Sequence, residues 1–136
     1  MNYKKWLFVF SAFVLTFCTG VLIRRFVIIK YFAPDIKFES RSHDFGEIER
    51  DIPVSTWFKF ENIGIMPLQI KNVISSCDCT TFQFPQNKIN CGGKDSIFVR
   101  FDASKKDNFY QQIYIYSNAT EIPIALYIVG ACVDKE

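Results

Sequence analysis

The sequence predicts an all-β domain, an antiparallel β-sandwich of about seven strands, preceded by one N-terminal transmembrane helix. Apolar and polar side chains alternate over short stretches after Pro34, and turn residues separate these stretches roughly every 8–12 positions, as is typical of a sandwich. Aromatic residues make up 17% of the chain, and aromatic side chains pack well on a pleated sheet. An uncharged apolar run of helical length opens the chain.

The uncharged run is Trp6–Ile23, with the sequence WLFVFSAFVLTFCTGVLI. A helix of this length rises about 27 Å, which is close to the thickness of a bilayer's hydrocarbon core. Lys4 and Lys5 precede the run, and Arg24 and Arg25 follow it. Because no small-x-small cleavage site follows, we expect an uncleaved signal anchor.

Two other readings of this segment stay open, a cleaved signal peptide and a lipid at Cys18, which comes late in the apolar run. The positive charges on the two sides are balanced, so the orientation rests on the usual export of a β-domain behind a short N-terminal tail. We therefore expect an anchor over residues 1–33 and a β-sandwich over residues 34–136. The chain is predicted to be a single-pass membrane protein with its C-terminal domain extracytoplasmic, in the periplasm or at the cell surface.

The net charge of +2 hides an uneven distribution. Five of the 16 basic residues lie in residues 1–33, which contain no acid. This leaves 11 basic and 14 acidic residues, a net charge of −3, in residues 34–136. An acidic domain binds the phosphate backbone poorly, so no nucleic-acid partner is expected.

Pro34 ends the N-terminal helix, and the remainder is expected to form strands. The predicted strands are Ile36–Ser42, Val54–Glu61, Leu68–Ser75, Thr81–Phe84, Asp95–Asp102, Tyr110–Ser117 and Ile122–Val133. Their apolar faces form the predicted core, which consists of Val54, Thr56, Phe58, Phe60, Leu68, Ile70, Ile74, Ile97, Val99, Phe101, Ile113, Ile115, Ile122, Ile124, Leu126 and Ile128. Burying these side chains offsets the ordering entropy of a domain of this size.

A series of short motifs carries a family resemblance. In chain order they are His43-Asp44-Phe45-Gly46-Glu47-Ile48, Phe58–Gly64, Pro67–Ile70, Ser76-Cys77-Asp78-Cys79-Thr80, Ile97–Asp102, Ser117-Asn118 and Gly130. Residues 36–133 thereby resemble the bacterial domain of unknown function family numbered 1573, which is similar to immunoglobulin-like domains of major sperm protein and hydin type. The resemblance implies an immunoglobulin-like sandwich in an exported or envelope protein and brings no established activity. The chain departs from the family at Asp78 and at Cys91-Gly92-Gly93, where the family usually has Gly and Pro-Gly.

Four cysteines lie outside the anchor: Cys77, Cys79, Cys91 and Cys132. If successive strands alternate in direction, Cys77, Cys79 and Cys132 share one pole and Cys91 lies at the other. We expect a disulfide from Cys77 or Cys79 to Cys132, because Cys77 and Cys79 are too close to bond without a strained ring. Reduced, inert thiols remain an alternative, as does a thiolate metal or redox site at Cys77, Cys79 and Cys132.

Tyrosines mark one face of the last two predicted strands. Tyr110, Tyr114 and Tyr116 share a face on one strand, as do Ala125, Tyr127 and Val129 on the other. An in-phase register would place Tyr127 near Tyr110 and Tyr114. Since tyrosine is enriched at interfaces, the candidate partner-binding residues are Tyr110, Tyr114, Tyr116, Tyr127 and Val129.

No catalytic constellation is recognisable in the sequence. His43 and Asp44 are neighbours, but adjacent strand residues point to opposite faces and cannot easily act together. We therefore expect a non-enzymatic protein with no cofactor and no small-molecule substrate. The predicted function is that of a membrane-anchored interaction or scaffold module of the bacterial envelope whose partner is another envelope protein. The alternative is a thiol-based metal-binding or redox protein that uses Cys77 and Cys79.

Overall fold

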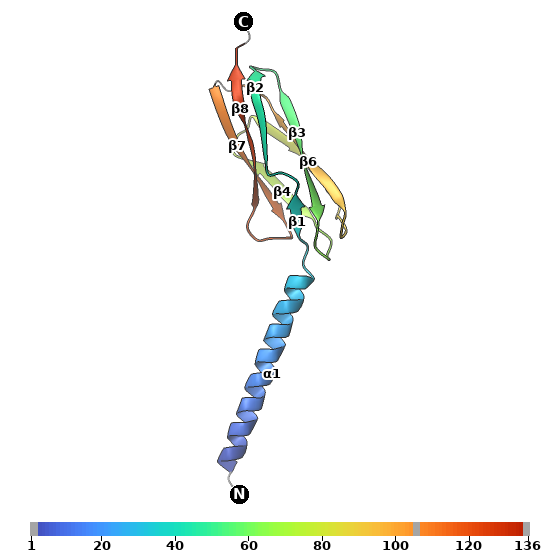
Figure 1. Ribbon diagram of the computed structural model, residues 1–136, viewed down its shortest axis with the longest axis vertical. Helices are drawn as coiled ribbons and strands as arrows, with labels where there is room; N and C mark the ends of the chain where they lie inside the picture. Colours follow the sequence, from blue (N-terminus) through green and yellow to red (C-terminus); the bar gives the residue numbers. More distant parts are fainter. Residues whose placement is uncertain (1–2, 105–106, 135–136) are drawn as a thin grey trace. The chain divides into compact units, whose positions relative to one another are not determined.

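A computed structural model describes residues 3–104 and 107–134 of the chain (Figure 1). The chain divides into two compact units, Met1–Ala33 and Pro34–Glu136, and each is considered by itself.

The first unit consists of one helix, α1 (Tyr3–Tyr31). It contains the whole uncharged run and ends before Pro34, as the ring of proline requires. The helical conformation predicted for this run is therefore confirmed. Within the part of the chain that the structure describes, no helix is both long and apolar enough to cross a membrane.

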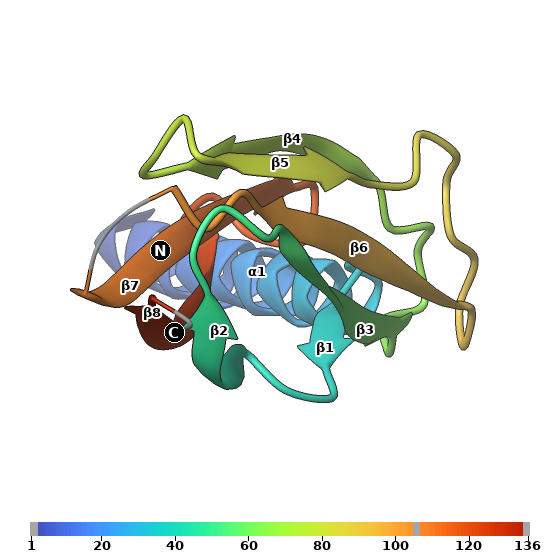
Figure 2. The same cartoon turned by 90° about the horizontal axis from the view of Figure 1, so that it is seen from above.

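The second unit is a β-sandwich, as predicted. Within residues 34–104 and 107–134 its strands are β1 (Ile36–Phe38), β2 (Ser42–Glu49), β3 (Val54–Asn62), β4 (Ile70–Ser75), β5 (Thr80–Gln83), β6 (Lys94–Phe101), β7 (Asp107–Ser117) and β8 (Ile124–Val133). They form a first sheet with the order β1-β3-β6-β5 and a second sheet with the order β2-β8-β7-β4. Figure 2 shows the two sheets end on, with the edge strands β4 and β5 side by side.

Strand β2 is missing from the sequence prediction, which placed a single strand over residues 36–42. β2 pairs with β8 in parallel, whereas the other strand pairs in the described chain are antiparallel. Its register shifts between Asp44 and Glu47, and Gly46 there has a φ of 65°. The Gly46 N–H donates to Asp44 Oδ1 at 2.8 Å. This bulge breaks the alternation of side chains, so the period-two signal of the strand is lost.

Most of the predicted core is buried, including the completely buried Ile97, Val99, Phe101, Ile113, Ile115, Leu126 and Ile128. The prediction was wrong for Ile74 and Ile122, which are 44% and 76% exposed. A register shift between Ile70 and Asn72 reverses the faces of β4, so Val73 is buried instead of Ile74. Ile122 precedes β8 and lies in the turn before it. Val54, Thr56 and Ile124 are only partly buried.

Asn62 organises the motif that follows β3. The side chain is completely buried, and its Nδ2 donates to the carbonyls of Met66 and Ile89, both at 2.9 Å. Its Oδ1 accepts the Gly64 N–H at 3.0 Å. Beyond this turn, the backbone of Leu68 pairs with that of Ile89. The buried amide therefore finds backbone partners for its own polar atoms, and it ties the turn after β3 to the Leu68–Ile89 bridge.

Candidate functional site

The candidate interaction surface lies on the outer side of the second sheet. We call it the tyrosine face and define it by the predicted residues Tyr110, Tyr114, Tyr116, Tyr127 and Val129. In the β7–β8 register, Tyr110 lies opposite Val129, and Tyr127 lies opposite Gln112, between Tyr110 and Tyr114. The rings of Tyr110 and Tyr127 are 5.5 Å apart between centroids and tilted by 34°. The predicted neighbourhood of Tyr110 and Tyr127 is therefore confirmed.

Exposure is highest at Tyr110, whose side chain is 58% exposed, and lower at Tyr116, at 38%. Tyr114 and Tyr127 are partly buried, and the Tyr114 hydroxyl donates to Gln112 Oε1. Ile74 lies opposite Tyr114 on β4 and continues the surface with an exposed aliphatic side chain. Ile74 was predicted to lie in the core, so its place on this surface was not expected from the sequence.

A shallow hollow of about 390 Å³ adjoins the exposed end of the tyrosine face. It is lined by Asp44, Gly46, Glu47, Asn108, Phe109, Tyr110, Val129, Gly130 and Ala131. Among these described residues two are carboxylates and none is a cation. The hollow therefore combines an aromatic wall with negative charge.

A second aromatic pair lies on the outer side of the first sheet and consists of the exposed Trp57 and the partly buried Phe98. The two residues are opposite each other on β3 and β6, and their ring centroids are 4.7 Å apart. Trp57 is 58% exposed. This pair was not predicted, although Trp57 alternates in phase with the polar residues Ser55 and Lys59, which indicates the outer face.

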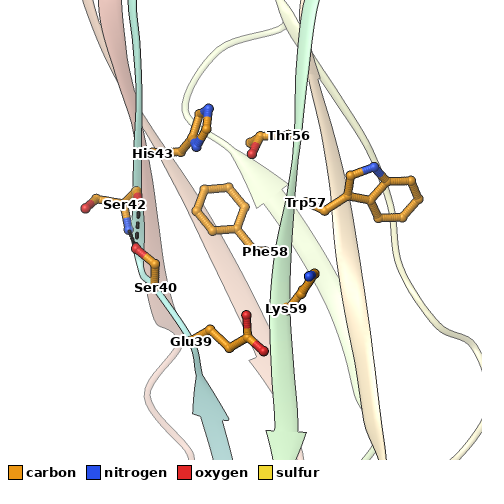
Figure 3. Close-up of a pocket in the computed structure, with 8 residues that line it drawn as sticks. All are labelled: Glu39, Ser40, Ser42, His43, Thr56, Trp57, Phe58 and Lys59. Carbon is orange, nitrogen blue, oxygen red and sulfur yellow. Dashed lines mark hydrogen bonds between the residues drawn. The ribbon is translucent and has the colours of Figure 1, made fainter.

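His43 lines a small cavity of about 80 Å³ between β2 and β3 (Figure 3). The His43 ring points toward Phe58, whereas Trp57 points away from the cavity. The His43 ring also meets the Phe45 ring edge-on, with 4.5 Å between the ring centroids. Asp44 lies instead at the hollow on the outer face. The expectation that His43 and Asp44 do not form a pair is therefore confirmed.

The structure corrects the predicted disulfide. Cys77 and Cys79 are bonded to each other, and Cys132 is a free, buried thiol. The tight turn after β4 brings the Cα atoms of Cys77 and Cys79 to 5.2 Å, inside the usual range for disulfides. Cys132 is only 4% exposed and packs in the core. The described chain holds no group of three or more His, Cys, Asp or Glu side chains arranged for a metal ion.

The poles of the sandwich are as predicted for the cysteines. Thr80, next to Cys79, pairs with Phe101 at the end of β6, and Cys91 precedes the start of the same strand.

Burial raises the pKa of the Cys132 thiol; Arg50 opposes the shift, and Asp102 and Asp51 add to it. Cys132 is therefore a protonated thiol near neutral pH.

Backbone and side-chain hydrogen bonds hold the turn that carries the disulfide. The Ser76 N–H donates to the Gln112 carbonyl at 2.9 Å, and the Ser76 hydroxyl donates to Gln111 Oε1 at 3.1 Å. On the side of the first sheet, the Asp102 N–H donates to the Cys79 carbonyl at 3.0 Å. The disulfide closes a loop of three residues, so in the chain-entropy model it stabilises the folded state by about 1.5 kcal/mol. The predicted bridge to Cys132 would stabilise the folded state by about 4 kcal/mol. The turn is thus anchored to both sheets without the bridge.

Solved structures with a similar fold come from several organisms. A PapD-like domain of human CEP192 has a TM-score of 0.64 at 9% identity and covers 76% of this chain and 89% of that one. A protein of unknown function from Porphyromonas gingivalis W83 has a TM-score of 0.65 at 16% identity and covers 74% and 48%. The secreted serine protease VesC from Vibrio cholerae has a TM-score of 0.55 at 11% identity, but the match covers only 25% of that chain, against 82% of this one. At these identities the likeness establishes the PapD-like, immunoglobulin-like fold alone.

Sequence comparison identifies the family to which the chain belongs. No curated protein matches it. The family described as "Protein of unknown function (DUF1573)" matches residues 36–132, which is most of the chain and nearly all of the β-sandwich. The chain therefore belongs to the DUF1573 family, as its series of motifs indicated.

Proposed function

We propose that this protein is a membrane-anchored, extracytoplasmic interaction module of the bacterial envelope that binds another envelope protein through its tyrosine face. The immunoglobulin-like fold and a family without a known activity are consistent with a module that binds rather than catalyses. The observation that carries the proposal is that the exposed Tyr110 packs against the partly buried Tyr127 on the outer side of the sheet. Tyrosine supplies a large contact area at a small cost in side-chain entropy, which suits it to interfaces.

The chemistry of the adjoining hollow indicates what the partner presents. Asp44 and Glu47 contribute two carboxylates beside the ring of Tyr110. A guanidinium or ammonium group that enters the hollow would stack on the tyrosine ring and pair with the carboxylates. We therefore expect the partner to insert an arginine or lysine side chain here, with apolar neighbours that cover Val129 and Ile74.

The uncharged run Trp6–Ile23 supports the membrane part of the proposal. It lies wholly within α1, and its phenylalanines Phe10, Phe13 and Phe17 are each 66–70% exposed. Large apolar side chains in such numbers on one helix need an apolar environment. Lipid would provide it.

Site-specific photo-crosslinking in intact cells tests the interaction. A photoreactive side chain in place of Tyr110 should capture a second envelope protein, and the same side chain in place of Trp57 is the matched control on the opposite face. Asp44→Lys and Glu47→Lys should reduce the yield about tenfold, whereas Glu39→Lys, which changes an acid away from the hollow, should not. Capture from position 57 alone, or a product consisting of two copies of this chain, would contradict the proposed surface.

Thiol labelling tests the location separately. Cys91 is exposed and free, so a membrane-impermeant maleimide should label intact cells without prior reduction, and Cys91→Ser should abolish this labelling. The protein should also stay in the membrane fraction after alkaline extraction. Labelling that requires lysis of the cells would overturn the extracytoplasmic location, and release by alkali would overturn the anchor.

A further inference from the structure

We infer that the Cys77–Cys79 disulfide is a reversible thiol–disulfide exchange site for a dithiol of another exported protein. The inference concerns the pole of the sandwich at the end of β4, and it does not depend on the tyrosine face. It rests on three observations: hydrogen bonds hold the turn besides the bridge, Cys77 is more exposed than Cys79, and a backbone N–H donates to the Cys77 sulfur.

The bridge contributes little as a structural crosslink. It spans only Cys77 to Cys79, so it restricts the unfolded chain far less than a long-range disulfide would. The turn is already fixed to β7 through Ser76 and to the end of β6 through the Cys79 carbonyl. Opening the bridge should therefore leave both sheets intact, which is what a reversible site requires.

The two sulfurs are not equivalent. Cys77 is partly exposed, whereas Cys79 is 9% exposed and belongs to the core. The Cys79 N–H donates to Cys77 Sγ at 3.2 Å. In the reduced protein this N–H would stabilise a thiolate on Cys77, because a hydrogen bond to the charged form favours it. Cys77 is therefore the sulfur that meets a client, and Cys79 is the resolving partner.

The exchange needs only the bridge and the client dithiol. A client thiolate attacks Cys77 Sγ, the Cys77–Cys79 bond breaks, and the electron pair leaves on Cys79 as a thiolate, which takes up a proton. The second client thiolate then attacks the client sulfur of the mixed disulfide and expels the Cys77 thiolate. The Cys79 N–H stabilises this thiolate by donating a hydrogen bond to it. The client has been oxidised to a disulfide, and Cys77 and Cys79 have been reduced to two thiols. The reverse sequence reduces a client disulfide.

The remaining cysteines of the sandwich are poorly placed to take part. Cys132 is buried, and Cys91 lies at the opposite end of β6. The proposal therefore assigns the chemistry to Cys77 and Cys79 alone.

The test compares two single variants, Cys79→Ser and Cys77→Ser, in the full-length chain with Cys18→Ser and Cys91→Ser as background. Both variants lose the bridge, so both share any loss of stability that this causes. A difference between their reaction rates therefore reports on which of the two thiols is more reactive. With glutathione disulfide as the probe, Cys79→Ser should form a mixed disulfide at Cys77 at least about tenfold faster than Cys77→Ser forms one at Cys79. Equal rates, or a faster reaction at Cys79, would overturn the assignment.

A second measurement uses the intact Cys77–Cys79 pair in the same background. Reduced glutathione should open the bridge while near-ultraviolet circular dichroism stays native, and exchange into glutathione disulfide should oxidise the two thiols back to the bridge. A bridge that opens only when the domain unfolds is a structural crosslink and would overturn the inference. Neither result bears on the tyrosine face, so a failure here is distinguishable from a failure of the proposed interaction.

Discussion

The ring of Phe109 closes over the backbone of Gly130. A Cβ built at position 130 would lie 2.7 Å from Phe109 Cζ, closer than real Cβ contacts. Phe109 stacks in turn on Phe101, with 4.3 Å between the ring centroids, so the ring is held in the core. The absence of a side chain at position 130 thus makes room for the Phe109 ring in the core.

We expect Gly130→Ala to lower the free energy of unfolding by about 1–3 kcal/mol, because Phe109 and the Gly46 carbonyl must both move. Chemical denaturation of the parent and the variant measures this loss. Gly20→Ala, at a position with open space around it, is the control and should leave the β-sandwich transition unchanged. An unchanged midpoint for Gly130→Ala would show that the contact is readily relieved.

Asn62→Ala should destabilise the sandwich by about 3 kcal/mol. The substitution strips partners from the Met66 and Ile89 carbonyls and from the Gly64 N–H in a buried place. Asn118 provides a matched control, because its amide also bridges backbone groups but is exposed to water. Equal losses for Asn62→Ala and Asn118→Ala in urea denaturation would contradict the importance of burial.

The shifted register of β4 predicts opposite outcomes at two neighbouring positions. Val73→Ala should cost about 2 kcal/mol, since Val73 is 2% exposed, whereas Ile74→Ala should cost less than about 1 kcal/mol. Thermal unfolding of the two variants checks the order. The reverse order would restore the face assignment predicted from the sequence.

Cys132 should make stability fall at alkaline pH. Burial raises the pKa of its thiol in the folded state, so the folded state holds a proton that the unfolded chain releases near its usual value of about 8.5. The stabilisation is complete below that pH and is lost as the pH rises toward the folded pKa. The free energy of unfolding should therefore decline more steeply above about pH 8 in the parent than in Cys132→Ala. Parallel declines in urea denaturation at several pH values would contradict this.

The alternation of side chains was sufficient to predict the sandwich, because a period of two survives wherever a strand has one buried face. It placed the strands that carry Phe58, Ile97, Ile113 and Leu126, and it predicted that Tyr110 and Tyr127 would be neighbours. The even spacing of turns and the order of motifs led to the immunoglobulin-like fold and the family. These features are local in sequence, so no knowledge of distant contacts was needed.

Tertiary structure decided what alternation could not. The bulges at Gly46 and after Ile70 reset the side-chain phase. As a result, the alternation did not predict β2, and it assigned Val73 and Ile74 to the wrong faces of β4. The pairing of Cys77 with Cys79 depends on the fold of one tight turn, and the burial of Cys132 depends on its place in the packed core. The hollow beside Tyr110 exists because β2 lies parallel to β8, an arrangement between distant segments that leaves no periodic trace in the chain.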